Sequence, residues 1–118
     1  MGALLLFTGC KNEEDFGING TYQRPYNVDG IAYQVQLILS TDGKLSWNPL
    51  ETIPGHTSSQ VEYVLLSGKQ FRITGDADCG TDAVYNYVVS DTELQLTSET
   101  DSCEPRKNAL SGNWPRVD

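Results

Sequence analysis

The side chains best suited to chemistry in this sequence are one histidine and a short run of carboxylates. His56 lies in a segment rich in proline and glycine, and the chain has no nucleophile-elbow motif, so a histidine-based triad lacks its sequence pattern. Asp76–Asp82 places carboxylates at its first, third and seventh positions, a spacing that can wrap calcium. The closing glutamate of a calcium loop is absent, because Tyr87 stands at that position. We therefore predict no catalytic residue, no metal and no cofactor.

The first ten residues end on a cysteine that could carry a lipid. Ala3–Phe7 is an apolar run that is shorter than the roughly 20 residues of a membrane span and shorter than a complete signal-peptide core. Phe7-Thr8-Gly9-Cys10 resembles the lipobox of bacterial lipoproteins, in which small residues precede a cysteine that is lipidated and becomes the new N-terminus. This resemblance implies a truncated signal peptide at residues 1–9 and a lipid on Cys10. The alternative is a first strand followed by a buried thiol.

An acidic segment follows this cysteine. Lys11–Asp15 contains three adjacent acidic residues and resembles the signal that, in one branch of Gram-negative bacteria, directs lipoproteins to the outer face of the outer membrane. A solvated tether is the simpler interpretation, since like charges repel one another and stay in water. Both interpretations make residues 10–19 a tether. The resemblance implies a lipid-anchored protein of the outer membrane, on its periplasmic or its outer side.

Two further cysteines, Cys79 and Cys103, remain if Cys10 carries a lipid. An exported protein permits a disulfide between them, and the cysteine spacings match no zinc site. Such a bridge closes a loop of about 25 residues and stabilises the fold by about 3 kcal/mol in the chain-entropy model. Two reduced core thiols are the alternative.

The charge of the chain limits its partners. With 8 basic and 16 acidic residues, the formal net charge is -8, which repels both nucleic-acid phosphates and anionic lipid head groups. We therefore expect no nucleic-acid partner, and contact with a membrane through the lipid anchor only.

The elements that position these residues are β-strands, because the dominant pattern from Gly20 onward has a period of two. In Ile31–Ser40 every odd position is large and apolar, which is typical of a strand with one buried face. The same alternation recurs at Leu45/Trp47, Val61/Tyr63/Leu65, Phe71/Ile73, Tyr85/Tyr87/Val89 and Leu94/Leu96. We also expect a first strand near Gly20–Arg24 and a last strand near Asn113–Val117.

Turn residues separate these runs at regular intervals. The predicted hairpin connections are residues 41–44, 67–69 and 90–92, and the predicted longer loops are residues 48–58 and 75–82. Pro105 suits the first turn of a short helix over Cys103–Leu110, and Gly112 suits its end. Eight short strands joined to their neighbours are most simply closed into an antiparallel up-and-down barrel, because closure removes exposed sheet edges. A β-sandwich is the competing architecture.

Several short motifs resemble lipocalin-like barrel domains over residues 20–117. They are Gly20-Thr21-Tyr22, Asp78-Cys79-Gly80, Tyr85-Asn86-Tyr87, the segment Asp101–Arg106, and Trp114. Tyr22 stands where lipocalins typically have tryptophan. The resemblance implies a lipocalin-like barrel domain at residues 20–118. We expect Arg106 to stack on Trp114 and close the bottom of the barrel by a cation–π contact.

Inward-facing aromatic residues are the candidate walls of a binding pocket. They are Tyr33, Trp47, Tyr63, Phe71, Tyr85 and Tyr87. Such rings can line a pocket that is apolar on its walls and polar at the hydroxyl tips, or they can simply fill the barrel. We predict an anchored, non-enzymatic protein that binds a small apolar ligand, with loop 48–58 as a lid. The alternative is a filled barrel that contacts another envelope protein through its loops, which a packed interior and an exposed apolar loop patch would favour.

Overall fold

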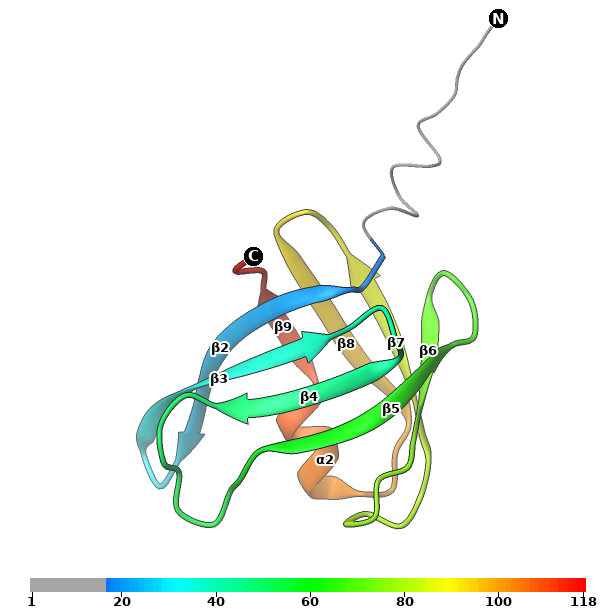
Figure 1. Ribbon diagram of the computed structural model, residues 1–118. Coiled ribbons are helices and arrows are strands. Elements are labelled where there is room, and N and C mark those ends of the chain that lie inside the picture. The colour runs from blue at the N-terminus through cyan, green and yellow to red at the C-terminus, as the bar shows by residue number, and fades with distance from the viewer. Residues whose placement is uncertain (1–16) are drawn as a thin grey trace, which may run out of the picture.

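In the computed structural model, residues 17–118 are described; the predicted signal peptide, Cys10 and most of the predicted tether lie outside them. The strands are β2 (Gly20–Val28), β3 (Ile31–Leu39), β4 (Lys44–Pro49), β5 (Ser59–Leu65), β6 (Gln70–Thr74), β7 (Ala83–Val89), β8 (Glu93–Thr100) and β9 (Gly112–Pro115). One short helix, α2 (Glu104–Leu110), precedes β9 (Figure 1). Over residues 17–118, no helix combines the length and apolarity needed to cross a bilayer.

Each strand pairs with its neighbour in sequence. The eight strands form one antiparallel sheet in the order β2 to β9, so the predicted hairpins are confirmed. The first strand runs to Val28, four residues beyond the predicted end at Arg24. Asp29 and Gly30 then form the turn, with φ angles of 52° and 82°. Two consecutive positive φ angles match the twist of a tight hairpin, and Gly and Asp tolerate them best.

The sheet closes on itself where its two edge strands meet. Tyr22 and Arg116 form an antiparallel bridge, and the amide of Val117 donates to the carbonyl of Thr21 at 2.9 Å. The Tyr22 hydroxyl donates to the Ile18 carbonyl at 2.9 Å and accepts from Arg116 at 3.1 Å. The result is a nearly closed barrel, so the predicted up-and-down barrel with one short helix is confirmed and the sandwich is wrong.

The barrel interior is the core of the protein, and it begins earlier than expected. The inward residues of β3, including Val35 and Leu37, are fully buried, as the alternating pattern predicted. Ile18 is also buried, at 1% exposure, although the prediction placed it in the tether. An apolar side chain gains free energy by covering the open end of the barrel, so the folded domain starts two residues before Gly20.

One end of the barrel is sealed by an arginine on an indole ring. The guanidinium carbon of Arg24 lies 4.0 Å from the centroid of the Trp114 ring. Arg24 also donates to the carbonyls of Ser111 at 2.9 Å and Ala109 at 2.8 Å, at the end of α2. A Cβ on Gly112 would lie 2.7 Å from this guanidinium, and Gly112 has a φ of +118°. Glycine is therefore required there.

Arg24, and not the predicted Arg106, is the cation that stacks on Trp114. The physical reason is that Arg106 lies on α2 with its guanidinium directed at the carboxylate of Asp101, with which it forms an ion pair at 2.8 Å. The sequence alone did not show which arginine stacks on Trp114. The predicted first strand ends at Arg24, so nothing in the pattern placed this residue inside the barrel.

Candidate functional site

Four of the six predicted wall residues pack against one another inside the barrel. Phe71 lies at their centre: its ring centroid is 5.9 Å from those of Tyr63, Tyr85 and Tyr87. Phe71 and Tyr85 are stacked, and both are fully buried. Contacts between aromatic rings at this spacing are favourable packing contacts. This level of the barrel is therefore filled by its own side chains.

The hydroxyl tips of these tyrosines are bound by the protein itself. Tyr63 donates to the Ser40 carbonyl at 2.8 Å, and Tyr87 donates to the Ser67 carbonyl at 3.3 Å. Tyr85 donates to the carboxylate of Asp101. Burial raises the pKa of all three hydroxyls. They stay neutral donors that hold turns in place, which assigns them a structural role.

Trp47, another predicted wall residue, lies in a separate aromatic cluster beside loop 50–58. Its ring meets the edge of Tyr26 with centroids 5.3 Å apart, and His56 lies 5.4 Å from Tyr26 and 6.3 Å from Trp47. Ile53 of the same loop is buried at 2% exposure. The indole Nε1 of Trp47 is buried and has no hydrogen-bond partner within the part of the chain that the structure describes.

Tyr33, the sixth predicted wall residue, is half-buried and lies opposite Tyr26 in the β2–β3 pair. The sequence did not identify Tyr26, because it was placed beyond the end of the first strand. His56 lies in a loop without an alternating pattern, so the sequence carries no signal for its contact with Tyr26. The alternation of Tyr22, Arg24 and Tyr26 is the signal that could have found the longer strand.

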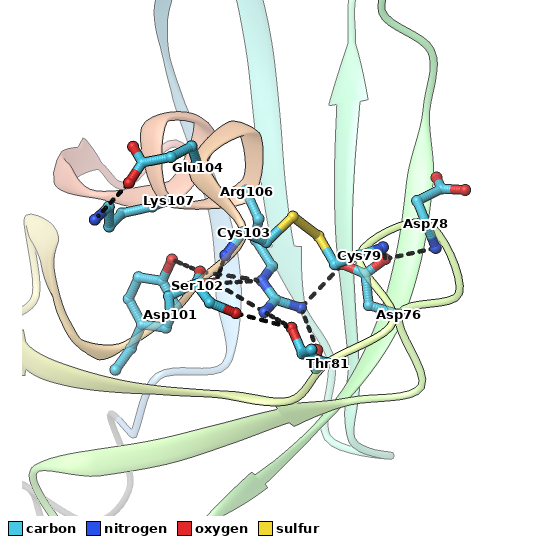
Figure 2. A network of polar contacts seen from close by, with 11 residues as sticks. Asp76, Asp78, Cys79, Thr81, Asp101, Ser102, Cys103, Glu104, Arg106 and Lys107 are labelled. Atoms are coloured by element: carbon cyan, nitrogen blue, oxygen red, sulfur yellow. Dashed lines mark hydrogen bonds and ion pairs between the residues drawn. A yellow bond between two sulfur atoms is a disulfide. The ribbon is translucent and has the colours of Figure 1, made fainter.

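A buried ion-pair network joins α2 to loop 75–82 (Figure 2). Arg106 contacts the carboxylates of Asp101 at 2.8 Å and Asp76 at 3.2 Å. It also donates to the Thr81 carbonyl at 2.9 Å. Planar guanidinium groups suit such multiple acceptors. The network holds the bottom loop against the helix.

The balance of these contacts keeps Asp101 ionised. Burial raises the pKa of Asp101, but hydrogen bonds from Arg106, Tyr85 and the Cys103 amide outweigh burial and hold that pKa below its usual value. Burial lowers the pKa of Arg106, but the hydrogen bond to Asp101 and the negative charge of Asp101 raise it by more, so the pKa of Arg106 lies above its usual value. Both groups therefore carry their charges at neutral pH and neutralise each other.

A disulfide reinforces the same junction. Cys79 of loop 75–82 is bonded to Cys103, which precedes α2, with the two Cα atoms 5.8 Å apart. Asp76 stabilises the turn of this loop, since its Oδ1 accepts hydrogen bonds from the backbone amides of Asp78 and Cys79 at 3.1 and 3.2 Å. Over residues 17–118, no group of three His, Cys, Asp or Glu side chains converges as metal ligands. The contacts of Asp76 therefore give this residue of the loop a structural role.

Apolar side chains are exposed at the opposite end of the barrel. We call Leu65, Leu66, Val88 and Val89 the apolar rim. Together with Gly17 they line an open hollow of about 980 Å³ beside the β5–β6 turn. Leu65, Leu66 and Val88 are 52%, 43% and 66% exposed. Contiguous exposed apolar side chains make this end of the barrel a candidate interaction surface. The alternating pattern placed Leu65 with the inward residues Val61 and Tyr63, and its exposure corrects that prediction. The run Val64-Leu65-Leu66, which breaks the alternation, is the sequence signal that could have indicated an exposed apolar end.

No protein-family model matches this chain, and no curated protein matches it in sequence.

We predict that Asp101→Asn lowers the free energy of unfolding by about 3 kcal/mol at pH 7, because it leaves the buried Arg106 charge short of its main partner. The stabilisation by Asp101 is present above the carboxyl pKa of the unfolded chain, about 3.9, and is lost as pH falls through the lowered pKa of the folded state. Urea unfolding of the original chain and of the Asp101→Asn variant over a pH series measures the difference between their free energies of unfolding. This difference should shrink in acid.

The matched control is Glu62→Gln, which makes the same chemical change in the exposed Lys44–Glu62 pair. Exposed pairs contribute less than about 1 kcal/mol. A loss of unfolding free energy for Asp101→Asn as small as that of the control would contradict the role of the Asp101–Arg106 pair. A loss that persists unchanged in acid would also contradict it.

Proposed function

We propose that this chain is a non-catalytic lipoprotein of the bacterial envelope, held at the membrane through Cys10, whose lipocalin-like barrel binds another envelope component through its outer surface. The observation that carries this proposal is the filled interior combined with the apolar rim. Phe71 and its three tyrosine neighbours occupy the middle of the barrel, while Leu65, Leu66 and Val88 are left in water. Binding through the surface is the function that such a distribution supports.

Two features support the absence of catalysis. The buried charged residues among residues 17–118 are Asp101 and Arg106, which form an ion pair with each other. The buried tyrosine hydroxyls have raised pKa values and internal partners. A general acid or base must reach a substrate and titrate near the working pH, and neither set of groups meets both conditions.

Two features support the anchor. Phe7-Thr8-Gly9-Cys10 has the small residues and the cysteine of a lipobox. Cys79 and Cys103 form a disulfide, which suits a protein exported to an oxidising compartment and leaves Cys10 without either of them as a partner. We infer that the outer membrane of a Gram-negative bacterium is its location.

Replacement of Cys10 tests the anchor. Cys10→Ser, expressed in a host that processes lipoproteins, should move the protein from the membrane fraction to the soluble fraction, because a hydroxyl cannot receive the thioether-linked lipid. Immunoblotting of the separated fractions gives the result. Unchanged fractionation of the variant would exclude the anchor.

A photo-crosslinking amino acid at position 88 tests the binding surface. We expect benzoylphenylalanine in place of Val88 to form adducts with an envelope component on irradiation of cells. The matched control is the same residue in place of Leu50, which is equally apolar, 51% exposed and at the other end of the barrel. Mass spectrometry identifies the adducts. Equal crosslinking at both positions would indicate that the apolar rim is not a specific surface.

The buried indole of Trp47 favours a second candidate function, the binding of a small apolar ligand that carries a hydrogen-bond acceptor. Its Nε1 is buried without a partner among residues 17–118, and Tyr26 and His56 flank the ring. A buried donor without an acceptor costs about 1–3 kcal/mol, and a ligand acceptor under loop 50–58 would relieve that cost.

Trp47→Phe tests this candidate, because it keeps an aromatic ring and removes the donor. If a ligand uses the indole, native mass spectrometry should show it on the purified protein and about tenfold less of it on the variant. Protein purified without any retained small molecule, or equal retention by both forms, would argue against a ligand at this cluster.

A further inference from the structure

We propose that the apolar rim lies against the phospholipid surface of the membrane that holds the anchor. The inference rests on the proposed lipidation of Cys10. It goes further in naming the occupant of the rim, the orientation of the barrel and the residues in contact. It also departs from the sequence-based expectation that the protein contacts the membrane through its lipid anchor only.

The first argument is the place where the chain joins the domain. Gly17 lines the same hollow as Leu65, Leu66 and Val88. Cys10 lies seven residues before Gly17, so the anchored sulfur can be at most about 25 Å from that hollow even when the chain is fully extended. An anchored barrel therefore keeps its apolar rim within one short tether of the bilayer.

The second argument is the chemistry of the rim. Its aliphatic side chains are flanked by Lys69, which lines the hollow, and none of the described residues lining the hollow is acidic. Arg72 lies opposite Val64 in the neighbouring strand pair and is exposed. Aliphatic side chains beside cations suit the boundary between acyl chains and phosphate groups. Asp42 and Asp91 are exposed in the β3–β4 and β7–β8 turns at the same end of the barrel, so this cationic character is confined to the hollow itself.

The third argument is the orientation that such contact imposes. Figure 1 shows the β5–β6 and β7–β8 turns at the same end of the barrel as the start of β2, while α2 lies at the other end. Loop 75–82, with Asp76, Asp78 and Asp82, is bound to α2 through Arg106 and the disulfide. Docking of the rim therefore directs this acidic loop away from the lipid phosphates, which lowers their mutual repulsion.

A small apolar patch suffices because the contact is intramolecular once the anchor is in place. Attachment through a short linker creates an effective concentration in the millimolar range, so even a weak contact becomes populated. A free protein partner has no such advantage. The tether thus favours the bilayer over a protein as the occupant.

Fluorescence of the full lipidated chain in phosphatidylcholine vesicles tests the proposal. With Cys10 lipidated and Cys79 bonded to Cys103, a cysteine introduced by Val88→Cys is the thiol available for an environment-sensitive NBD label. We expect its emission to shift to the blue and to be quenched by a quencher carried on the lipid. The matched control, Leu50→Cys with the same label, should show neither effect.

A second variant, Leu65→Ser/Leu66→Ser, checks that the apolar side chains cause the contact. We expect the ratio of docked to undocked barrel, read from quenching at position 88, to fall about tenfold, because two half-exposed leucines lose their transfer into lipid. Thermal unfolding should be nearly unchanged, since both side chains are already about half exposed.

The outcomes separate the two proposals. Protein that floats with the vesicles while the label at position 88 stays in water overturns membrane contact by the rim and leaves the anchor intact. Crosslinks from position 88 to one protein in cells, combined with that result, would assign the rim to a protein partner. Protein that does not float with the vesicles overturns both the anchor and the contact that depends on it.

Discussion

The structure depends on the pairing of its first strand with its last. Tyr22 and Arg116 bring the two edges of the sheet together, and this closure gives the inward side chains of all eight strands one common interior. Burial raises the pKa of Tyr22 to about 12 despite the nearby charge of Arg116, so its hydroxyl remains a neutral donor to the Ile18 carbonyl. Closure thus links the start of the domain, its end and its core in one cluster.

The two ends of the barrel are built differently, and this difference organises the function that we propose. At the α2 end, Arg24, Arg106 and the disulfide bind the segments around α2 to one another, and the aromatic cluster of Trp47 lies at the same end beside loop 50–58. At the other end, tight turns leave Leu65 and Leu66 exposed beside the incoming chain. The stable end supports the barrel, and the apolar end is available to the envelope.

The sequence determined the strands well because their signal is local. The period of two in Ile31–Ser40 and the Asp42-Gly43 turn each need only a few neighbouring residues to be recognised. Partners distant in sequence were harder to predict. Arg24 and Arg106 are both plausible partners of Trp114 until the end of β2 is known, and Asp101 resembles a turn residue until Arg106 is seen beside it. The proposed binding surface is formed by residues near two turns that no local pattern connects.

The contacts of Arg116 also have a mechanical meaning. In the anchored form that we propose, drag and collision act as force along the tether, and that force would enter the barrel at Asn19 and Gly20. Arg116 donates to the Asn19 carbonyl at 3.1 Å, and the Thr21 amide donates to Asp118 at 3.0 Å. The load is thus passed from the first strand to the last residues of the chain and shared across the seam, so tension on the tether does not act on β2 alone.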